Sequence, residues 1–190
     1  MEKRQAHRHV LVNYDVVVPF VEEQTKRSLQ AHTRSQSKID SVVHAKFSRW
    51  FKHEVPMEST LHSKEMKLLV CGPMIQARHF GAYNVNANKF RTITKEDGLK
   101  TQNSGAYVSS NTRSYASMCD NIVAVGSVPY YGKIMDIIEL NYSCHFIVVL
   151  FKCVWADTTT SRGIKQNHLG LTSVNFSRLI HTGVQEEDEL

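Results

Sequence analysis

The clearest β-strand pattern in the chain lies between Tyr130 and Trp155 and reads YYGKIMDIIELNYSCHFIVVLFKCVW. Its first part, Tyr130–Leu140, mixes apolar and polar residues in the partial alternation that is typical of a half-buried strand. Its second part, Phe146–Trp155, is rich in the β-branched and aromatic residues that pack well on a pleated surface. The segment 141–145 between them has a length suited to a hairpin, although it lacks an Asn-Gly or Asp-Gly signal. The sequence therefore predicts two antiparallel strands.

The residues after Trp155 extend this pattern. Asp157–Gly163 is polar and ends in glycine, which indicates a surface loop. Leu169–Ile180 then offers a third strand. We therefore expect a small, incomplete antiparallel β-sheet or barrel in this part of the chain.

Five short motifs follow one another from Tyr130 onward: Tyr-Tyr-Gly, Asp-Ile-Ile-Glu-Leu, Leu-Phe-Lys-Cys-x-Trp, Arg-Gly-Ile-Lys and Val-Asn-Phe. In this order they resemble the plant transposon family catalogued as domain of unknown function 4216. Proteins of that family are encoded by CACTA (En/Spm-like) elements, typically after a transposase core. Upstream segments that also resemble these proteins are Phe47–Phe51, Asn84–Asn86, Lys89–Thr92 and Leu99–Gly105.

The chain departs from the pattern of this family in three respects. Val154 and Ala156 stand where relatives usually have Asp and Phe, and Ala87 stands where they usually have Gly. Because only glycine takes a positive φ without a steric cost, Ala87 predicts a strained turn. Relatives also continue past the Gly183 region into a further apolar strand, so we expect this chain to be C-terminally truncated.

Composition bounds the class of protein. A chain of 190 residues is long enough for one ordinary domain with a core, and its 42% hydrophobic content excludes a globally disordered chain. We predict an α+β protein with a helical segment at 1–56, an irregular, linker-like region with a short helix or strand at 57–126, a β-rich domain at 127–184 and an acidic tail at 185–190. The formal charge of +5 is mildly basic, which favours contact with polyanions.

The N-terminal segment carries the clearest helical pattern. Ile39, Val42, Val43, Phe47, Trp50 and Phe51 recur at three- and four-residue intervals, which predicts a helix from about Lys38 until Pro56 ends it. Ser37 is a plausible N-cap, and a shorter helix is expected at Pro19–Leu29. The other face of the long helix carries basic residues, which either contact a nucleic-acid backbone or form an ordinary solvated face.

The middle of the chain is less regular. Leu61–Val70 predicts a further helix that ends near Gly72-Pro73. Gln102–Ser117 is rich in Ser, Asn, Thr and Gly and reads as a linker. Met118–Val125 then predicts a strand, followed by a turn at residues 126–129.

The sequence offers no recognisable catalytic, metal or cofactor site. The four cysteines contain no Cys-x-x-Cys pair, so buried free thiols are expected, and the ten histidines read as ordinary surface residues. Asp136 and Glu139 lie on opposite faces of a strand and would not converge on a metal ion. The family resemblance implies that the catalytic core lies upstream and is absent here. We therefore expect no enzyme activity, no cofactor and no small-molecule substrate.

These observations predict a non-catalytic accessory or binding module of a plant CACTA-type transposon protein, acting with DNA, chromatin or transposase in the nucleus. No secretory signal and no membrane segment is evident. The residues expected to contact nucleic acid are Lys46, Arg49, Lys52, Lys133, Lys152, Arg162 and Lys165. If the sheet binds nucleic acid, Tyr130, Tyr131 and Trp155 are the expected stacking residues, although such aromatic residues more often belong to a core. A protein-protein interaction or oligomerisation module and an inactive transposon relic are the alternatives.

Overall fold

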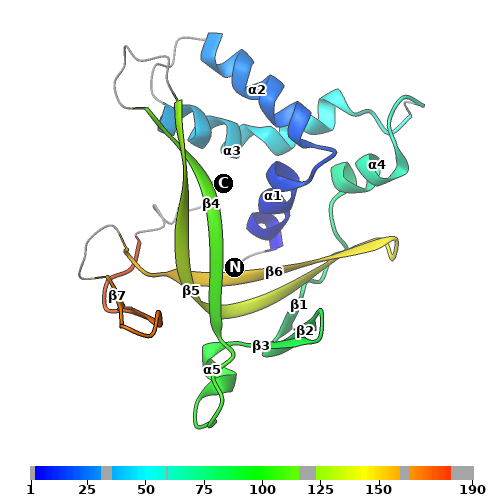
Figure 1. The fold of residues 1–190 in the computed structure, drawn as a ribbon. Helices are drawn as coiled ribbons and strands as arrows, with labels where there is room; N and C mark the ends of the chain where they lie inside the picture. The colour runs from blue at the N-terminus through cyan, green and yellow to red at the C-terminus, as the bar shows by residue number, and fades with distance from the viewer. Residues whose placement is uncertain (1–2, 31–35, 59, 116–122, 159–162, 181–190) are drawn as a thin grey trace. The chain divides into compact units, whose positions relative to one another are not determined.

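A computed structural model describes residues 3–30, 36–58, 60–115, 123–158 and 163–180. The chain is α+β, with helices at its N-terminus followed by small antiparallel sheets that are not closed within these residues (Figure 1). The helices are α1 (Lys3–Asn13), α2 (Val18–Gln30), α3 (Gln36–Glu54), α4 (Lys64–Cys71) and α5 (Ile93–Glu96). The strands are β1 (Arg78–Phe80), β2 (Ala82–Val85), β3 (Asn88–Arg91), β4 (Gly105–Tyr115), β5 (Val123–Tyr142), β6 (Phe146–Trp155), β7 (Ile164–Gln166) and β8 (Thr172–Val174).

The contacts divide the chain into two compact units. The helical unit comprises Met1–Phe80 and Ile138–Leu150, and the strand unit comprises Gly81–Ile137 and Phe151–Leu190. The largest sheet has the strand order β1-β5-β4, with β6 also paired to β5. Two short two-stranded sheets, β2-β3 and β7-β8, belong to the strand unit.

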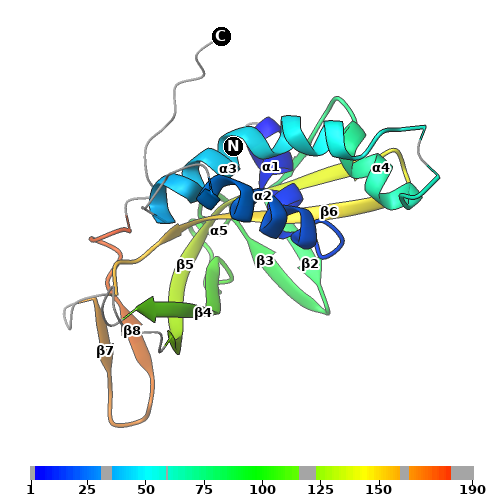
Figure 2. The same cartoon turned by 90° about the horizontal axis from the view of Figure 1, so that it is seen from above.

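The helical unit is built around an apolar core. Helices α1 to α4 and residues 138–150 of the β5–β6 hairpin share this unit (Figure 2) and contribute to one apolar cluster. Alternate residues of β5, Ile138, Leu140 and Tyr142, are fully buried, as expected for one face of a strand. Phe47 and Phe51 of α3 are also fully buried, and their rings stack at a centroid distance of 5.4 Å.

The sequence prediction for three of these helices is largely confirmed. The helices α2, α3 and α4 occupy the predicted segments, and Gly72 ends α4 at φ 82°. The hydroxyl of Ser63 caps the start of α4 by accepting a hydrogen bond from the Met66 N–H at 3.2 Å. The predicted N-cap Ser37 is wrong, because α3 already begins at Gln36. The helix α1 was not predicted, since its charged and polar residues obscure the apolar positions Ala6, Val10 and Leu11.

The predicted linker at Gln102–Ser117 is wrong over most of its length. Residues 105–115 form β4, which pairs antiparallel with β5 from Gly105↔Lys133 to Tyr115↔Val123. The predicted turn at 126–129 is also wrong, because these residues lie inside β5. Ladder hydrogen bonds join backbone groups, so a strand rich in Ser, Asn and Thr pairs as well as an apolar one where a face is solvated. The predicted strand at Met118–Val125 lies outside the described residues except for Val123–Val125, which belong to β5.

Two hairpin turns use positive φ without glycine. Asn86 and Ala87, with φ of 48° and 64°, connect β2 to β3, so the strained turn predicted at Ala87 is confirmed. Ser143 and Cys144, with φ of 51° and 60°, connect β5 to β6, which confirms the predicted hairpin. Asn141 supports this second turn, since its Oδ1 accepts a hydrogen bond from the Cys144 N–H at 2.7 Å.

The C-terminal strand prediction was too long. Of Leu169–Ile180, only Thr172–Val174 forms a strand, with an isolated bridge between Ala156 and Leu179 nearby. Asparagine side chains interrupt the rest: Asn167 Oδ1 accepts the N–H groups of Leu169 and Leu171, and Asn175 Oδ1 accepts that of Ser177. The acidic tail at 185–190 and most of the predicted loop Asp157–Gly163 lie outside the described residues.

Candidate nucleic-acid interface

Three of the predicted phosphate-contacting residues form one stripe along α3. Lys46, Arg49 and Lys52 are exposed and recur every three residues, which keeps them on one side of the helix. We call these three residues the basic stripe. The opposite side of α3 is anchored by the buried Phe47 and Phe51, so the packing of the core fixes which way the stripe faces.

The helix α1 adds positive charge that the sequence analysis missed. It carries Lys3, Arg4 and Arg8 and no acidic residue, and it packs against α3. His7 of α1 lies near cations of both helices. Its imidazole has a pKa lowered to about 4, mainly by burial and to a smaller extent by the charges of Lys52 on α3 and Lys3 on α1. Lys3 and Lys52 therefore lie close to the same ring although they are far apart in the sequence.

His7 is also hydrogen-bonded, in contrast to the expectation of ordinary surface histidines. Its Nδ1 lies 2.9 Å from the Tyr142 hydroxyl. The Tyr142 ring stacks on Phe146 at a centroid distance of 4.6 Å, and its burial raises the pKa of the Tyr142 phenol. With a pKa of about 4, His7 is neutral at pH 7, and its contact with the Tyr142 hydroxyl holds the ring in place.

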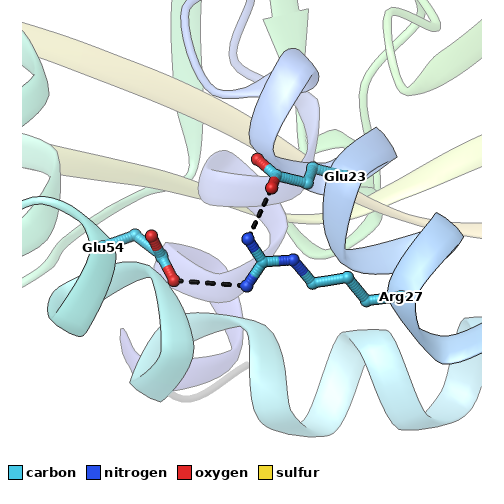
Figure 3. A network of polar contacts seen from close by, with 3 residues as sticks. All are labelled: Glu23, Arg27 and Glu54. Atoms are coloured by element: carbon cyan, nitrogen blue, oxygen red, sulfur yellow. Dashed lines mark hydrogen bonds and ion pairs between the residues drawn. The ribbon is translucent and has the colours of Figure 1, made fainter. Parts of the chain in front are cut away.

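The acidic residue nearest to the basic stripe in sequence is engaged elsewhere (Figure 3). Glu54 Oε1 lies 3.4 Å from Nη1 of Arg27, whose Nη2 lies 2.5 Å from Glu23 Oε1. The Glu23 hydrogen bond is the main cause of the raised pKa of the Arg27 guanidinium. Within the residues that the structure describes, no carboxylate forms an ion pair with Lys46, Arg49 or Lys52. In this part of the chain the stripe therefore presents positive charge without an ion-pair partner.

The charge of the whole chain follows the same division. The helical unit contains 13 Lys and Arg against 9 Asp and Glu, whereas the strand unit contains 10 against 9. Most of the excess positive charge therefore belongs to the unit that carries the basic stripe.

The remaining predicted residues are dispersed over the strand unit. Lys152 on β6 and Lys165 on β7 are exposed, and Arg162 lies outside the described residues. Lys133 on β5 contributes to lowering the pKa of Glu96, and its Nζ lies 4.7 Å from the centroid of the Phe176 ring. Lys133 therefore interacts with residues of its own unit, Glu96 and Phe176.

The aromatic residues of the sheet fall into two pairs. Tyr130 packs edge-on against Trp155 at a centroid distance of 6.3 Å, and the Trp155 ring covers Gly132, where an added Cβ would lie 2.8 Å from it. Tyr131 instead faces Tyr107, its partner on β4, at a centroid distance of 5.3 Å. Tyr107 is 63% exposed and was missed because its segment read as a linker. The consecutive Tyr107-Val108 was the one signal of a strand there.

Comparison with known proteins identifies one part of the chain. Residues 138–189 match a family described as "Domain of unknown function (DUF4216)". No curated protein and no solved structure matches the chain. The predicted resemblance to this family is therefore confirmed for that segment.

The DUF4216 segment contains Lys152, Lys165 and the C-terminal end of β5, whereas the basic stripe and Tyr107 lie before it. It also contains two described cysteines, Cys144 and Cys153. The expectation of buried thiols is wrong for Cys144, which is exposed in a hairpin turn, and for Cys71, which is exposed at the end of α4. Cys153 is half-buried, and burial raises the pKa of its thiol to about 11.

The two carboxylates of β5, Asp136 and Glu139, lie on opposite faces of the strand. Glu139, at the start of the DUF4216 segment, has a side chain that is 8% exposed, and its Oε1 lies 3.5 Å from Nη1 of Arg78. Asp136 is half-buried and occupies the opposite strand face, as predicted. Among the described residues, no group of three His, Cys, Asp or Glu side chains is arranged to hold a metal ion.

A shallow depression of about 360 Å³ lies beside α5 in the strand unit, before the DUF4216 segment. Its carboxylate, Glu96, is used by its own loop: Oε2 accepts the N–H groups of Asn103 and Ser104, and Oε1 accepts the Ser104 hydroxyl. Burial alone would raise the pKa of Glu96, but these hydrogen bonds and the charge of Lys133 lower it. This carboxylate therefore stabilises the loop at 96–104.

In the part of the chain that the structure describes, none of the helices has the length and apolar character needed to span a membrane.

Proposed function

We propose that the helical unit binds the phosphate backbone of duplex DNA through the basic surface of α1 and α3. The observation that carries this proposal is the basic stripe, whose three exposed cations have no ion-pair partner among the described residues and adjoin the acid-free helix α1. Such a surface binds through charge and has little means of reading base sequence.

The dimensions of the basic stripe suit this role. At about 1.5 Å of rise per residue, Lys46 and Lys52 are separated by about 9 Å along the helix axis. Phosphates of one strand follow each other about every 3.4 Å along a duplex axis, so flexible Lys and Arg side chains on this stripe reach two or three of them. Lys3, Arg4 and Arg8 on α1 extend the surface.

The proposal is tested by reversing the charge of the stripe in a triple variant, Lys46→Glu, Arg49→Glu and Lys52→Glu. A matched control reverses Lys89, Lys100 and Arg178, which are exposed residues of the strand unit. Both triples change the net charge equally. We expect the stripe variant to lose at least tenfold in affinity for labelled duplex DNA and the control to stay near the unaltered chain. Equal losses in the two variants would contradict the proposal.

The family resemblance supports a finer proposal: the chain is an accessory module of a plant CACTA-type transposon protein that acts with transposase or chromatin in the nucleus. The ordered motifs from Tyr130 onward support it, and the match of residues 138–189 supports its domain assignment. Co-precipitation of the tagged chain with the transposase of the same element, together with imaging of its location in plant cells, tests this proposal. A chain that stays outside the nucleus and retains no transposase would argue against it.

We further propose that this role is binding without catalysis. The use of Glu96 by its own loop supports this reading, because that carboxylate already stabilises the fold. The test incubates the purified chain with duplex DNA and Mg²⁺ or Mn²⁺. Cleavage that disappears in both Asp136→Asn and Glu139→Gln would overturn the proposal.

A protein-pairing role is the second candidate, favoured by one observation on β4. Within the described strands, β4 pairs only with β5, so its other edge is open. An open edge presents backbone donors and acceptors to another chain. Light scattering at low and high salt, with Ser110→Lys as the edge-blocking variant, tests it. Salt-resistant association that Ser110→Lys abolishes would favour pairing, whereas a monomer at every salt concentration would exclude it.

A further inference from the structure

The two faces of the β4–β5 ribbon differ in what covers them. On one face of β5, Gly132 and Ile134 are buried, and Trp155 lies over Gly132. The other face carries Tyr131 and, directly across on β4, Tyr107. We call this second face the tyrosine face. An antiparallel sheet with one covered face normally places polar residues on the other, so two aromatic rings there require an explanation.

Cross-strand packing explains only part of this arrangement. The two rings meet at 5.3 Å with an interplanar angle of 59°, a stabilising contact of the kind that pairs strands. Tyr107 nevertheless remains 63% exposed, so most of its surface has no protein neighbour among the described residues. The neighbouring positions of this face carry hydroxyls, since Ser109 Oγ lies 2.5 Å from Ser127 Oγ.

Positive charge adjoins the two tyrosines. Lys133 follows Tyr131 by two positions and therefore projects from the same face of β5. Its ammonium lies over the Phe176 ring, which adds a third aromatic group to this surface. Tyr107 is exposed, whereas Tyr131 and Phe176 are half-buried. Accessible aromatic rings beside a lysine are the combination with which proteins hold unpaired bases and the adjoining phosphates.

We infer that the tyrosine face binds single-stranded nucleic acid by stacking unpaired bases on Tyr107 and Tyr131. This inference rests on the proposed nucleic-acid role of the chain but places it in a different unit and assigns a different form of the ligand. Stacking accepts any base, so the face distinguishes unpaired from paired strands with little discrimination between sequences.

The experiment measures binding of the full chain to fluorescently labelled oligo-dT and oligo-U of about 16 nucleotides, the upper end of the site sizes that single OB-folds cover. Tyr107→Leu keeps an apolar side chain but removes the ring, and Tyr107→Phe keeps the ring. Val108→Ala is the matched control, because Val108 is also exposed but lies on the opposite face. We expect Tyr107→Leu to weaken single-strand binding by about tenfold, while Tyr107→Phe and Val108→Ala bind like the unaltered chain. Preference for oligo-dT or oligo-U identifies DNA or RNA as the source of the bases.

Failure of this inference is distinguishable from failure of the proposed function. Single-strand binding that is absent in the unaltered chain, or equal in Tyr107→Leu and Val108→Ala, would overturn the inference and leave duplex binding by the basic stripe intact. A folded Tyr107→Leu chain, checked by circular dichroism, that loses duplex and single-strand binding equally would also overturn it. Loss of single-strand binding in Tyr107→Leu, with duplex binding insensitive to reversal of the stripe, would support the inference and contradict the function proposed above.

Discussion

Different interactions stabilise the interior of the helical unit and the interior of the strand unit. In the helical unit, twelve buried residues from α1, α3, α4, their flanking segments and β5 form one apolar cluster. In the described part of the strand unit, the fully buried apolar side chains are Ile134, Ile137 and Ala156. The strand unit depends instead on the β4–β5 ladder and on side-chain hydrogen bonds such as those of Glu96. The two units should therefore respond to different kinds of substitution.

The largest effect is expected from removing an aromatic ring from the helical core. Phe51 is fully buried between Phe47 and Phe20, so Phe51→Ala should lower the free energy of unfolding by about 4 kcal/mol. Urea unfolding followed by Trp50 fluorescence in a Trp155→Phe background reports on this unit. The control Ile147→Ala, at a 52% exposed position of β6, should cost less than about 1 kcal/mol. Similar losses at both positions would contradict a well-packed core.

The second effect is a loss of stability of the helical unit at mildly acidic pH. His7 has a pKa of about 4 in the folded chain, below its value of 6.5 in model compounds, so the unfolded chain binds the proton more tightly. Stability is complete above pH 6.5 and falls as pH decreases toward 4, by about 2 kcal/mol between pH 7 and pH 5. The groups facing His7 are Lys3 on its own helix, Lys52 on α3 and the Tyr142 hydroxyl on β5. Urea titrations at both pH values should show the loss, and His7→Gln should abolish it; an unchanged loss in His7→Gln would assign it to another group.

The third effect concerns the polar support of the strand unit. Glu96→Gln leaves one acceptor oxygen where the carboxylate has two, so we expect a loss of about 1.5 kcal/mol. Because the folded pKa of Glu96 is lowered, its contribution is present above the ordinary glutamate pKa and disappears as pH falls through the lowered value. Unfolding followed by Trp155 fluorescence in a Trp50→Phe background measures it. A neutral Glu96→Gln would show that the loop at 96–104 is held by other contacts.

The smallest effect is a gain in stability at a strained turn. Ala87 has a φ of 64°, so Ala87→Gly should relieve the strain and stabilise the strand unit. The greater freedom of glycine in the unfolded chain reduces the gain to about 0.5 kcal/mol. The same substitution at Ala82, within β2, should destabilise the unit. A loss at both positions would show that the turn is not strained.

The sequence predicts elements where side chains alone carry the signal. The spacing of Phe47, Trp50 and Phe51 predicts α3, and the apolar run Phe146–Trp155 predicts β6 with the bounds that the structure has. Strand β4 escaped prediction because its pairing with β5 is a backbone property that its polar composition conceals. Glycine and proline at 126–129 suggested a turn, yet the partner strand holds both in an extended ladder.

In the candidate site, too, the sequence indicates local spacing but not the contacts between distant segments. The spacing of Lys46, Arg49 and Lys52 predicts from the sequence that they share one side of a helix, and the structure shows all three exposed. The approach of Lys3 to Lys52 around His7 depends on the packing of α1 against α3, which no local pattern encodes. Tyr107 becomes a candidate binding residue only through the register of β4 and β5, which places it opposite Tyr131.

The proposal of a phosphate-binding helical surface is tested most directly by the salt dependence of duplex binding. Each phosphate contact contributes about 0.9 to the slope of log affinity against log salt concentration. We predict that reversing Lys46, Arg49 and Lys52 reduces this slope by nearly 3, whereas reversing Lys89, Lys100 and Arg178 leaves it close to the original value. A slope that is unchanged in the stripe variant, or reduced equally in the control, would contradict the account.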